Sequence, residues 1–143
     1  MTPENNILIV TPRMEELASL CRSNSLIEAG LYREYDVKRG LRDVNGKGVL
    51  AGLTNISDII AQREVDGILQ PCPGELYYRG IRIEEHEQGF VREGRKGYEE
   101  VAYLLLFGRL PDAKELGSFK SLLAQGRMLP TNFTRDVIMK APT

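Results

Sequence analysis

The sequence lacks the features that membrane-spanning and nucleic-acid-binding proteins require. Its nineteen basic residues are balanced by twenty acidic ones, and the net charge of −1 supplies no long-range field to attract nucleic acid or an anionic membrane. Apolar runs such as Ile7–Val10 and Leu104–Phe107 are far too short to cross a bilayer. We therefore expect neither a nucleic-acid partner nor a membrane partner.

Cysteine is also scarce, with Cys21 in a predicted helix and Cys72 in a Pro-Cys-Pro-Gly segment. Neither spacing is that of a metal site, and two unrelated cysteines in a chain with an ordinary core indicate reduced thiols and a cytoplasmic protein. The N-terminal residues include Glu4, Glu15 and Glu16 and lack a basic segment followed by a long apolar one. This pattern argues against a transit peptide and against a secretory signal.

The length and composition fit about one folded domain. With 143 residues, of which 42% are hydrophobic and 27% charged, the chain is long enough and apolar enough to bury a core. Thr11 and Pro12 predict the N-cap and the first position of a helix that ends at Ser23-Asn24. A second, short helix is expected at Leu31–Tyr35.

A small sheet is expected in the middle of the chain. The glycine-rich, charged segment Asp36–Gly48 predicts an irregular connection. Branched residues in Val49–Ile60 favour strand segments, and Leu76–Tyr78 is a second strand candidate that follows a predicted turn at Pro71–Gly74. The two segments should pair, and because so small a sheet is marginal alone, it must lie on something else.

Helices should occupy the rest of the chain. The most apolar of them should pack in the core or against other helices through Tyr98, Tyr103 and Phe107, because it is apolar almost all round. The expected helices are Ile83–Phe90, Tyr98–Phe107, one that begins at the capping-box pair Asp112 and Glu115 and ends at Gly126, and one that begins at Pro130–Asn132.

The single histidine, His86, lies among Glu84, Glu85 and Glu87. Because the side chains of adjacent residues on a helix diverge, this cluster does not converge on a metal ion. A solvated acidic helix face is the favoured interpretation, and we expect no metal-ligating residue in the chain.

Several segments, taken in their order and spacing from Asp36 to Thr143, resemble one enzyme family, the citrate synthases. Tyr78-Arg79-Gly80 is similar to the end of the family's hairpin, and Tyr98–Gly108, Tyr-Glu-Glu-Val-Ala-Tyr-Leu-Leu-Leu-Phe-Gly, is similar to a helix that follows it. The resemblance implies a mainly α fold with a small β-hairpin or sheet. It assigns residues 1–35 to an N-terminal helical extension of bacterial type and residues 36–143 to the N-terminal part of the family's large domain, truncated.

The resemblance also implies a reaction, the condensation of acetyl-CoA with oxaloacetate to give citrate and CoA. Removing a proton from the acetyl methyl group and stabilising the enol suits a carboxylate base with hydrogen-bond donors. The family uses one aspartate and two histidines, the latter in Leu-His-Gly-Gly and Gly-His-Arg contexts. Neither context occurs here, and His86 matches neither. We therefore expect no catalytic residue in this chain and no condensation by it alone.

One residue is a candidate contact for the substrate. The segment Arg39–Gly48 resembles a Gly-Gly-Met-Arg-Gly-Met-Lys-Gly segment of eukaryotic citrate synthases, whose arginine is implicated in contacting CoA phosphates. Arg42 takes that place, and a guanidinium suits phosphate through its fixed fork of donors. The alternative is a solvated loop arginine, because the neighbouring Asp43 departs from the family pattern. No covalently bound cofactor is expected, and acetyl-CoA enters as a substrate of the parent enzyme.

Three functional hypotheses stay open. The first is an N-terminal fragment of a bacterial citrate synthase, whose partners are the remainder of that chain, a second copy in a homodimer, acetyl-CoA and oxaloacetate. The second is a fragment of a 2-methylcitrate synthase that acts on propionyl-CoA. The third is a short, non-catalytic binding paralogue. An isolated fragment should expose an apolar patch and self-associate.

Overall fold

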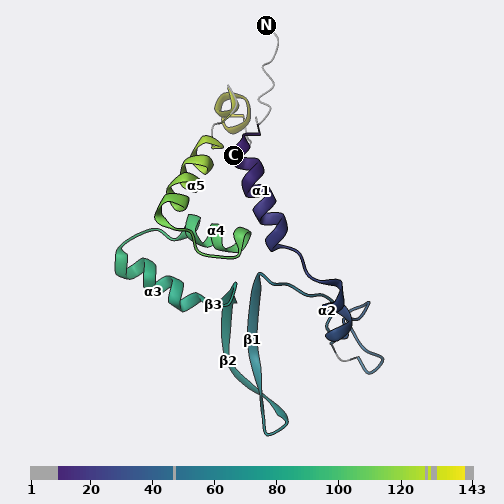
Figure 1. Cartoon of the computed structure of the whole chain (residues 1–143). Coiled ribbons are helices and arrows are strands. Elements are labelled where there is room, and N and C mark those ends of the chain that lie inside the picture. Colours follow the sequence, from purple (N-terminus) through teal and green to yellow (C-terminus); the bar gives the residue numbers. More distant parts are fainter. Residues whose placement is uncertain (1–9, 47, 128, 130–131, 141–143) are drawn as a thin grey trace.

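The computed structural model describes residues 10–46, 48–127, 129 and 132–140, and its elements form a helical group from which a β-hairpin projects (Figure 1). This mainly α architecture with a small antiparallel sheet confirms the expected fold class. The elements are α1 Pro12–Asn24, α2 Ala29–Glu34, β1 Ser57–Val65, β2 Ile68–Tyr78, β3 Ile81–Arg82, α3 Ile83–Glu93, α4 Tyr98–Phe107, α5 Ala113–Gln125 and a π-helix Thr134–Ile138.

The helix ends follow the capping signals of the sequence. The hydroxyl of Thr11 accepts a hydrogen bond from the Met14 amide at 3.3 Å and starts α1. At α5 the capping box is complete, since Asp112 accepts from the Glu115 amide at 2.8 Å while the Glu115 carboxylate accepts from the Asp112 amide at 3.0 Å. Helix α4 has the predicted bounds and ends at Gly108, whose φ of 78° is a left-handed conformation that glycine adopts freely.

The last helix is shorter than expected, with only one helical turn of π type at Thr134–Ile138. Part of its predicted start, at Pro130 and Thr131, lies outside the described residues, as does the segment Ala141–Thr143. Within the described residues, none of the helices combines the length and the apolar character needed to span a membrane.

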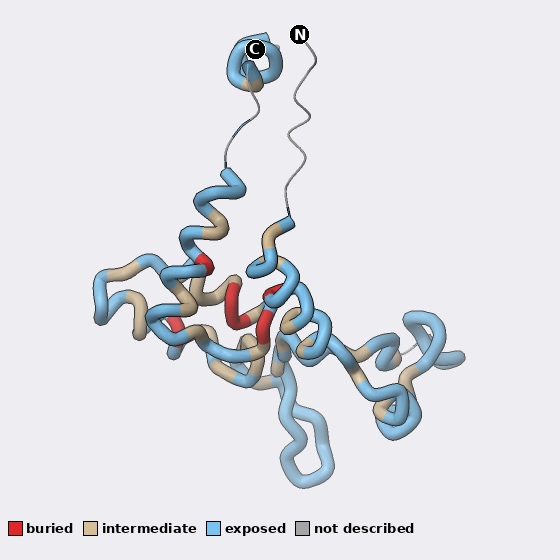
Figure 2. The backbone as a smooth tube through the Cα atoms, turned by 45° about the horizontal axis from the view of Figure 1, so that its top comes forward, coloured by how far each residue is buried: buried red, intermediate tan, exposed pale blue. Residues whose placement is uncertain are grey.

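The core forms where α1 and α5 pack against α4. Tyr103 and Leu104 of α4 are each 1% exposed, and Tyr103 and Phe107 join Leu17 of α1 and Phe119 of α5 in one buried cluster. The Tyr103 ring lies 4.5 Å from that of Phe107 and meets that of Phe119 edge-on at 5.5 Å. Figure 2 shows the buried residues gathered in this central region, while the hairpin and α2 are largely exposed.

The expectation that Tyr98 also packs in the core is wrong. Its side chain is 73% exposed, while Tyr103 and Phe107 are buried as expected. Tyr98 is the first residue of α4, and α1 and α5 cover only one side of that helix. An apolar helix therefore has an uncovered side within the described chain.

An ion pair closes the junction between α4 and α5. The Arg109 guanidinium donates to the Glu115 carboxylate at 2.8 and 2.5 Å and lies 5.9 Å from the centre of the Tyr103 ring. Hydrogen bonding from Arg109 is the main cause that lowers the pKa of Glu115 to about 2. Because this pKa is depressed in the fold, the stabilisation is present above the ordinary glutamate pKa and is lost as the pH falls towards 2.

The sheet is an antiparallel hairpin of β1 and β2, to which β3 adds a short third strand. The hairpin turns at Asp66-Gly67, whose positive φ values of 53° and 76° suit a two-residue turn between twisted strands. Val49–Ile60 contributes to the sheet only from Ser57 onward. The expected pairing is confirmed. Both strands extend further toward the hairpin turn than predicted, since β1 continues to Val65 and β2 begins at Ile68.

The predicted turn at Pro71–Gly74 is wrong, because this segment lies inside β2. The pairing shifts register here, with Ile60 opposite Glu75 and Gln62 opposite Pro71, so β2 carries extra residues in a bulge. Proline has no amide hydrogen and is tolerated in a sheet at such bulges, which explains how a turn-like sequence stays within a strand.

The corner between α3 and α4 requires a glycine. A Cβ on Gly97 would lie 2.1 Å from the ring of Phe90, so any side chain would displace that ring. The Arg95 guanidinium lies 5.0 Å from the centre of the same ring and donates to Glu100 at 2.5 Å. Gly97 is the N-cap residue of α4, so this contact lies directly at the start of that helix.

Arg79 connects the sheet to the helices. It has a φ of 49° in the turn between β2 and β3, and its guanidinium donates to three backbone carbonyls from separate segments. These are the carbonyls of Asn24 at the end of α1, at 3.2 Å, of Asn55 before β1, at 3.1 Å, and of Leu105 in α4, at 2.9 Å. A planar fork with five donors can serve all three at once, which an ammonium group cannot do with the same geometry.

We predict that Arg79→Lys destabilises the fold by about 2 kcal/mol, because a charged donor lost from partly buried carbonyls costs roughly that much. The unfolding midpoint in urea measures the effect. Arg92→Ala is the matched control, since Arg92 is an exposed arginine of α3. Equal midpoints for the two variants would show that the carbonyl contacts of Arg79 do not hold the sheet to the helices.

Candidate functional site

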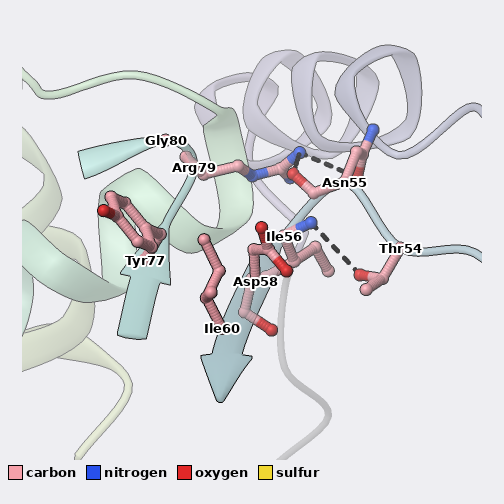
Figure 3. A pocket seen from close by; sticks show the side chains of 9 residues that line it. Thr54, Asn55, Ile56, Asp58, Ile60, Tyr77, Arg79 and Gly80 are labelled. Carbon is pink, nitrogen blue, oxygen red and sulfur yellow. Dashed lines mark hydrogen bonds between the residues drawn. The ribbon is translucent and has the colours of Figure 1, made fainter. Parts of the chain in front are cut away.

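A hollow of about 290 Å³ lies beside Arg79, between the start of β1 and the end of β2 (Figure 3). Several polar side chains gather there, and Figure 3 shows the Arg79 side chain reaching toward Asn55. The hollow is lined by Thr54, Asn55, Ile56, Ser57, Asp58, Ile60, Tyr77, Arg79 and Gly80.

Four of the polar side chains that line the hollow, those of Thr54, Asn55, Tyr77 and Arg79, have structural partners. Besides its three backbone acceptors, Arg79 donates to the side-chain oxygen of Asn55 at 2.9 Å, and the Thr54 hydroxyl accepts from the Ile56 amide at 3.1 Å. The Tyr77 hydroxyl donates to Glu75 at 2.6 Å, and this hydrogen bond is the main cause that raises the pKa of Tyr77. Such a tyrosine holds its proton more firmly, which makes it a poor general base.

Glu75 organises the flank of the hairpin. Besides the Tyr77 hydroxyl, its carboxylate accepts from the Arg63 guanidinium, with both oxygens at 2.9 Å. The hydrogen bond from Tyr77, followed by that from Arg63, lowers the pKa of Glu75. The carboxylate therefore stays ionised and connects β1 to β2 across the bulge, which is a structural role.

Arg42 lies in the irregular connection after α2, as the sequence predicted. Its guanidinium donates to the Gly46 carbonyl at 2.7 Å, and its backbone pairs with Gly48, so the loop folds back on itself. Arg42 is exposed, and among the described residues no carboxylate forms an ion pair with it. One end of the guanidinium thus fixes its orientation while the remaining donors face solvent, a geometry compatible with a phosphate ligand.

The expectation that His86 lies on a solvated helix face is wrong. His86 is 6% exposed, and its ring stacks on that of Phe90 at 6.2 Å. The divergence of neighbouring side chains is the reason, because Glu85 and Glu87 are exposed while His86 faces inward. Its Nε2 is buried and has no hydrogen-bond partner, so His86 is neither paired with an acid nor accessible to a substrate.

Arg42 and His86, the two residues that the sequence analysis examined most closely, lie on separate elements of the described chain. Figure 1 places the loop that carries Arg42 beside α2, on the opposite side of the hairpin from α3, which carries His86. Within the described chain, no group of three or more His, Cys, Asp or Glu could hold a metal ion. Cys21 and Cys72 are both free thiols.

Sequence reasoning missed the junction of Arg79 and Asn55. The available signal was the arginine directly before a glycine between two strands, since a non-glycine residue with positive φ is uncommon and needs support. The sequence could not show that the supporting carbonyls come from α1 and α4, because these lie 55 and 26 residues away along the chain.

Comparison with known proteins identifies the family. Residues 40–143 match the family model described as citrate synthase, C-terminal domain. Over 119 residues, which cover 80% of the chain, the sequence is 30% identical to the glyoxysomal citrate synthase of Cucurbita maxima. The chain covers 21% of the length of that relative. No solved structure gives a significant match.

The matched residues include the sheet and the helices α3, α4 and α5, whereas α1, which contributes Leu17 to the core, lies before the match. They run from the loop of Arg42, through the hairpin and the turn of Arg79, to the buried helix α4. They also make up more than half of the sequence. The chain therefore belongs to the citrate synthase family.

Proposed function

We propose that this chain is the N-terminal part of a bacterial citrate synthase and serves as structural scaffold within that enzyme. Two observations together support the proposal. The chain belongs to the citrate synthase family, and it covers only 21% of the length of its relative. The matching family model is described by a C-terminal domain. The motifs at Tyr78–Gly80 and Tyr98–Gly108 nevertheless resemble the N-terminal part of the family, and we place the chain there.

The parent enzyme would condense acetyl-CoA with oxaloacetate and release citrate and CoA. Proton removal, enol stabilisation and thioester hydrolysis need several groups held at one place, and a single acid or base supplies too little of the barrier reduction. The sequence has one histidine and neither of the family's two histidine contexts. That histidine, His86, is buried against Phe90, so the chemistry would belong to the rest of the parent.

We predict that the purified chain catalyses no condensation. Acetyl-CoA and oxaloacetate are incubated with it, and the free thiol of released CoA is measured against buffer alone. The full-length parent, assayed in parallel with acetyl-CoA and with propionyl-CoA, is the positive control and separates citrate synthase from 2-methylcitrate synthase. Thiol release by the chain clearly above buffer would contradict the proposal.

Arg42 is proposed to contact the phosphates of CoA in the parent enzyme. Support comes from the exposed guanidinium, held at one side by the Gly46 carbonyl, in a loop that carries more basic than acidic residues. Lys38 of the same loop is paired with Asp36 at 2.6 Å, which leaves Arg42 the better placed of the two for an external anion.

We predict that Arg42→Ala in the full enzyme raises the KM for acetyl-CoA by about tenfold with little change in kcat, because one charge-assisted phosphate contact is lost. The KM for oxaloacetate should stay the same. Arg39→Ala is the matched control, since Arg39 is an exposed arginine of the same loop. An unchanged KM for acetyl-CoA in Arg42→Ala would remove the assignment.

We also propose a cellular compartment and an oligomeric state for the parent enzyme. The free thiols of Cys21 and Cys72 support a reducing, cytoplasmic setting, and the uncovered side of α4 supports assembly with further chain and with a second copy in a homodimer. A reading frame that continues past Thr143 into both histidine contexts supports the fragment. A stop codon at that point favours the short binding paralogue.

A further inference from the structure

An apolar groove of about 210 Å³ lies between α1 and α5, with α4 as its floor. Figure 1 shows α1 and α5 rising from the two ends of α4 and standing apart. The groove draws on all three helices, and the residues that define it are Met14, Leu17 and Cys21 of α1, Leu106 of α4, and Phe119 and Leu122 of α5.

The groove combines a buried floor with an open apolar rim. Leu17 and Phe119 belong to the buried cluster, whereas Leu106 at the rim is 44% exposed. No charged side chain lines it among the described residues. A cavity of roughly 150 Å³ accommodates a benzene ring, so this groove has room for at least one large apolar side chain.

We propose that this groove receives the apolar face of a helix from the part of the parent citrate synthase that this chain lacks. The inference rests on the proposed function, because the occupant belongs to the same parent. Its support is the extent of the chain, which accounts for 21% of its relative and leaves most of that protein available to cover exposed apolar surface. An amphipathic helix that inserts side chains at i, i+3 and i+4 fits a groove with apolar walls and no charge.

The neighbouring surface supports the same occupant. Helix α4 also contributes to a second hollow, which is lined by Phe90, Tyr98, Val101 and Leu105, and the Tyr98 side chain is 73% exposed. A short polar peptide would leave this surface in water. Further helices of a larger protein can bury this second hollow as well as the groove.

Cys21 reports directly on whether the groove is occupied. It lines the groove, it is a free thiol, and the only other cysteine of the chain, Cys72, lies on the hairpin. The rate of iodoacetamide modification of Cys21 is measured by mass spectrometry of its peptide, in the isolated chain and in the full-length parent, with Cys72 as the internal reference. Because a buried thiol is inert, we expect Cys21 to react about tenfold more slowly in the parent, relative to Cys72.

A pair of variants of the parent tests the groove itself. Leu106→Glu places a charge on the rim and should restore the reactivity of Cys21. Leu110→Glu is the matched control, because Leu110 is 41% exposed and does not line the groove. Both positions are exposed in the isolated chain, so neither change removes a buried core residue.

Other occupants give different results. Cys21 protection in the parent that is lost when the parent is diluted would assign the groove to a second copy and overturn the proposal. Protection in the isolated chain that disappears on deletion of residues 1–9 would assign it to that segment, with the same consequence. Equal Cys21 rates in the isolated chain and the parent would also overturn it.

The thiol measurement and the activity of the parent separate the two proposals. If the parent forms citrate while Cys21 stays reactive, the proposed function is supported and the proposed helix in the groove is contradicted. If Cys21 is protected in the parent but the parent forms no citrate, the proposed helix in the groove is supported and the proposed function is contradicted.

Discussion

The burial of α4 is the constraint on which the rest of this structure depends. Tyr103 and Leu104 are the most completely buried side chains described, and α1 and α5 reach the core by packing on this helix. Burying a large apolar side chain contributes roughly 1.5–3 kcal/mol, which exceeds what an exposed ion pair supplies. The same helix also positions the hairpin, because Arg79 in the turn after β2 donates a hydrogen bond to the carbonyl of Leu105 in α4.

Local signals predicted the helices well, and the sheet less well. The caps at Thr11 and Asp112 involve residues within one turn of each other, so the sequence alone specifies them. The extent of β2 depends on pairing with β1, which carries the prolines of Pro71–Gly74 through as a bulge. The pairing with β1 overrides the turn propensity of those positions, and the local sequence alone does not predict this pairing.

The residues of the candidate site also differ in whether local sequence or tertiary contacts determine their positions. Arg42 was suggested by its resemblance to a family segment. The structure confirms only that it lies exposed in a loop, and its contact with CoA stays a prediction. The inward position of His86 follows from how α3 lies against the sheet, which three neighbouring glutamates masked in the sequence. The role of Arg79 depends on carbonyls far away along the chain. Membership in the citrate synthase family accounts for the fold of residues 40–143.

Amide hydrogen exchange of the isolated chain is the most direct test of the claim that α4 holds this scaffold together. Exchange of the most protected amides requires global unfolding, whereas exposed segments exchange through local opening. The account predicts the slowest exchange in Val101–Phe107, with much faster exchange in α2 and at the tip of the hairpin. Exchange of the α4 amides as fast as that of the hairpin tip would contradict it.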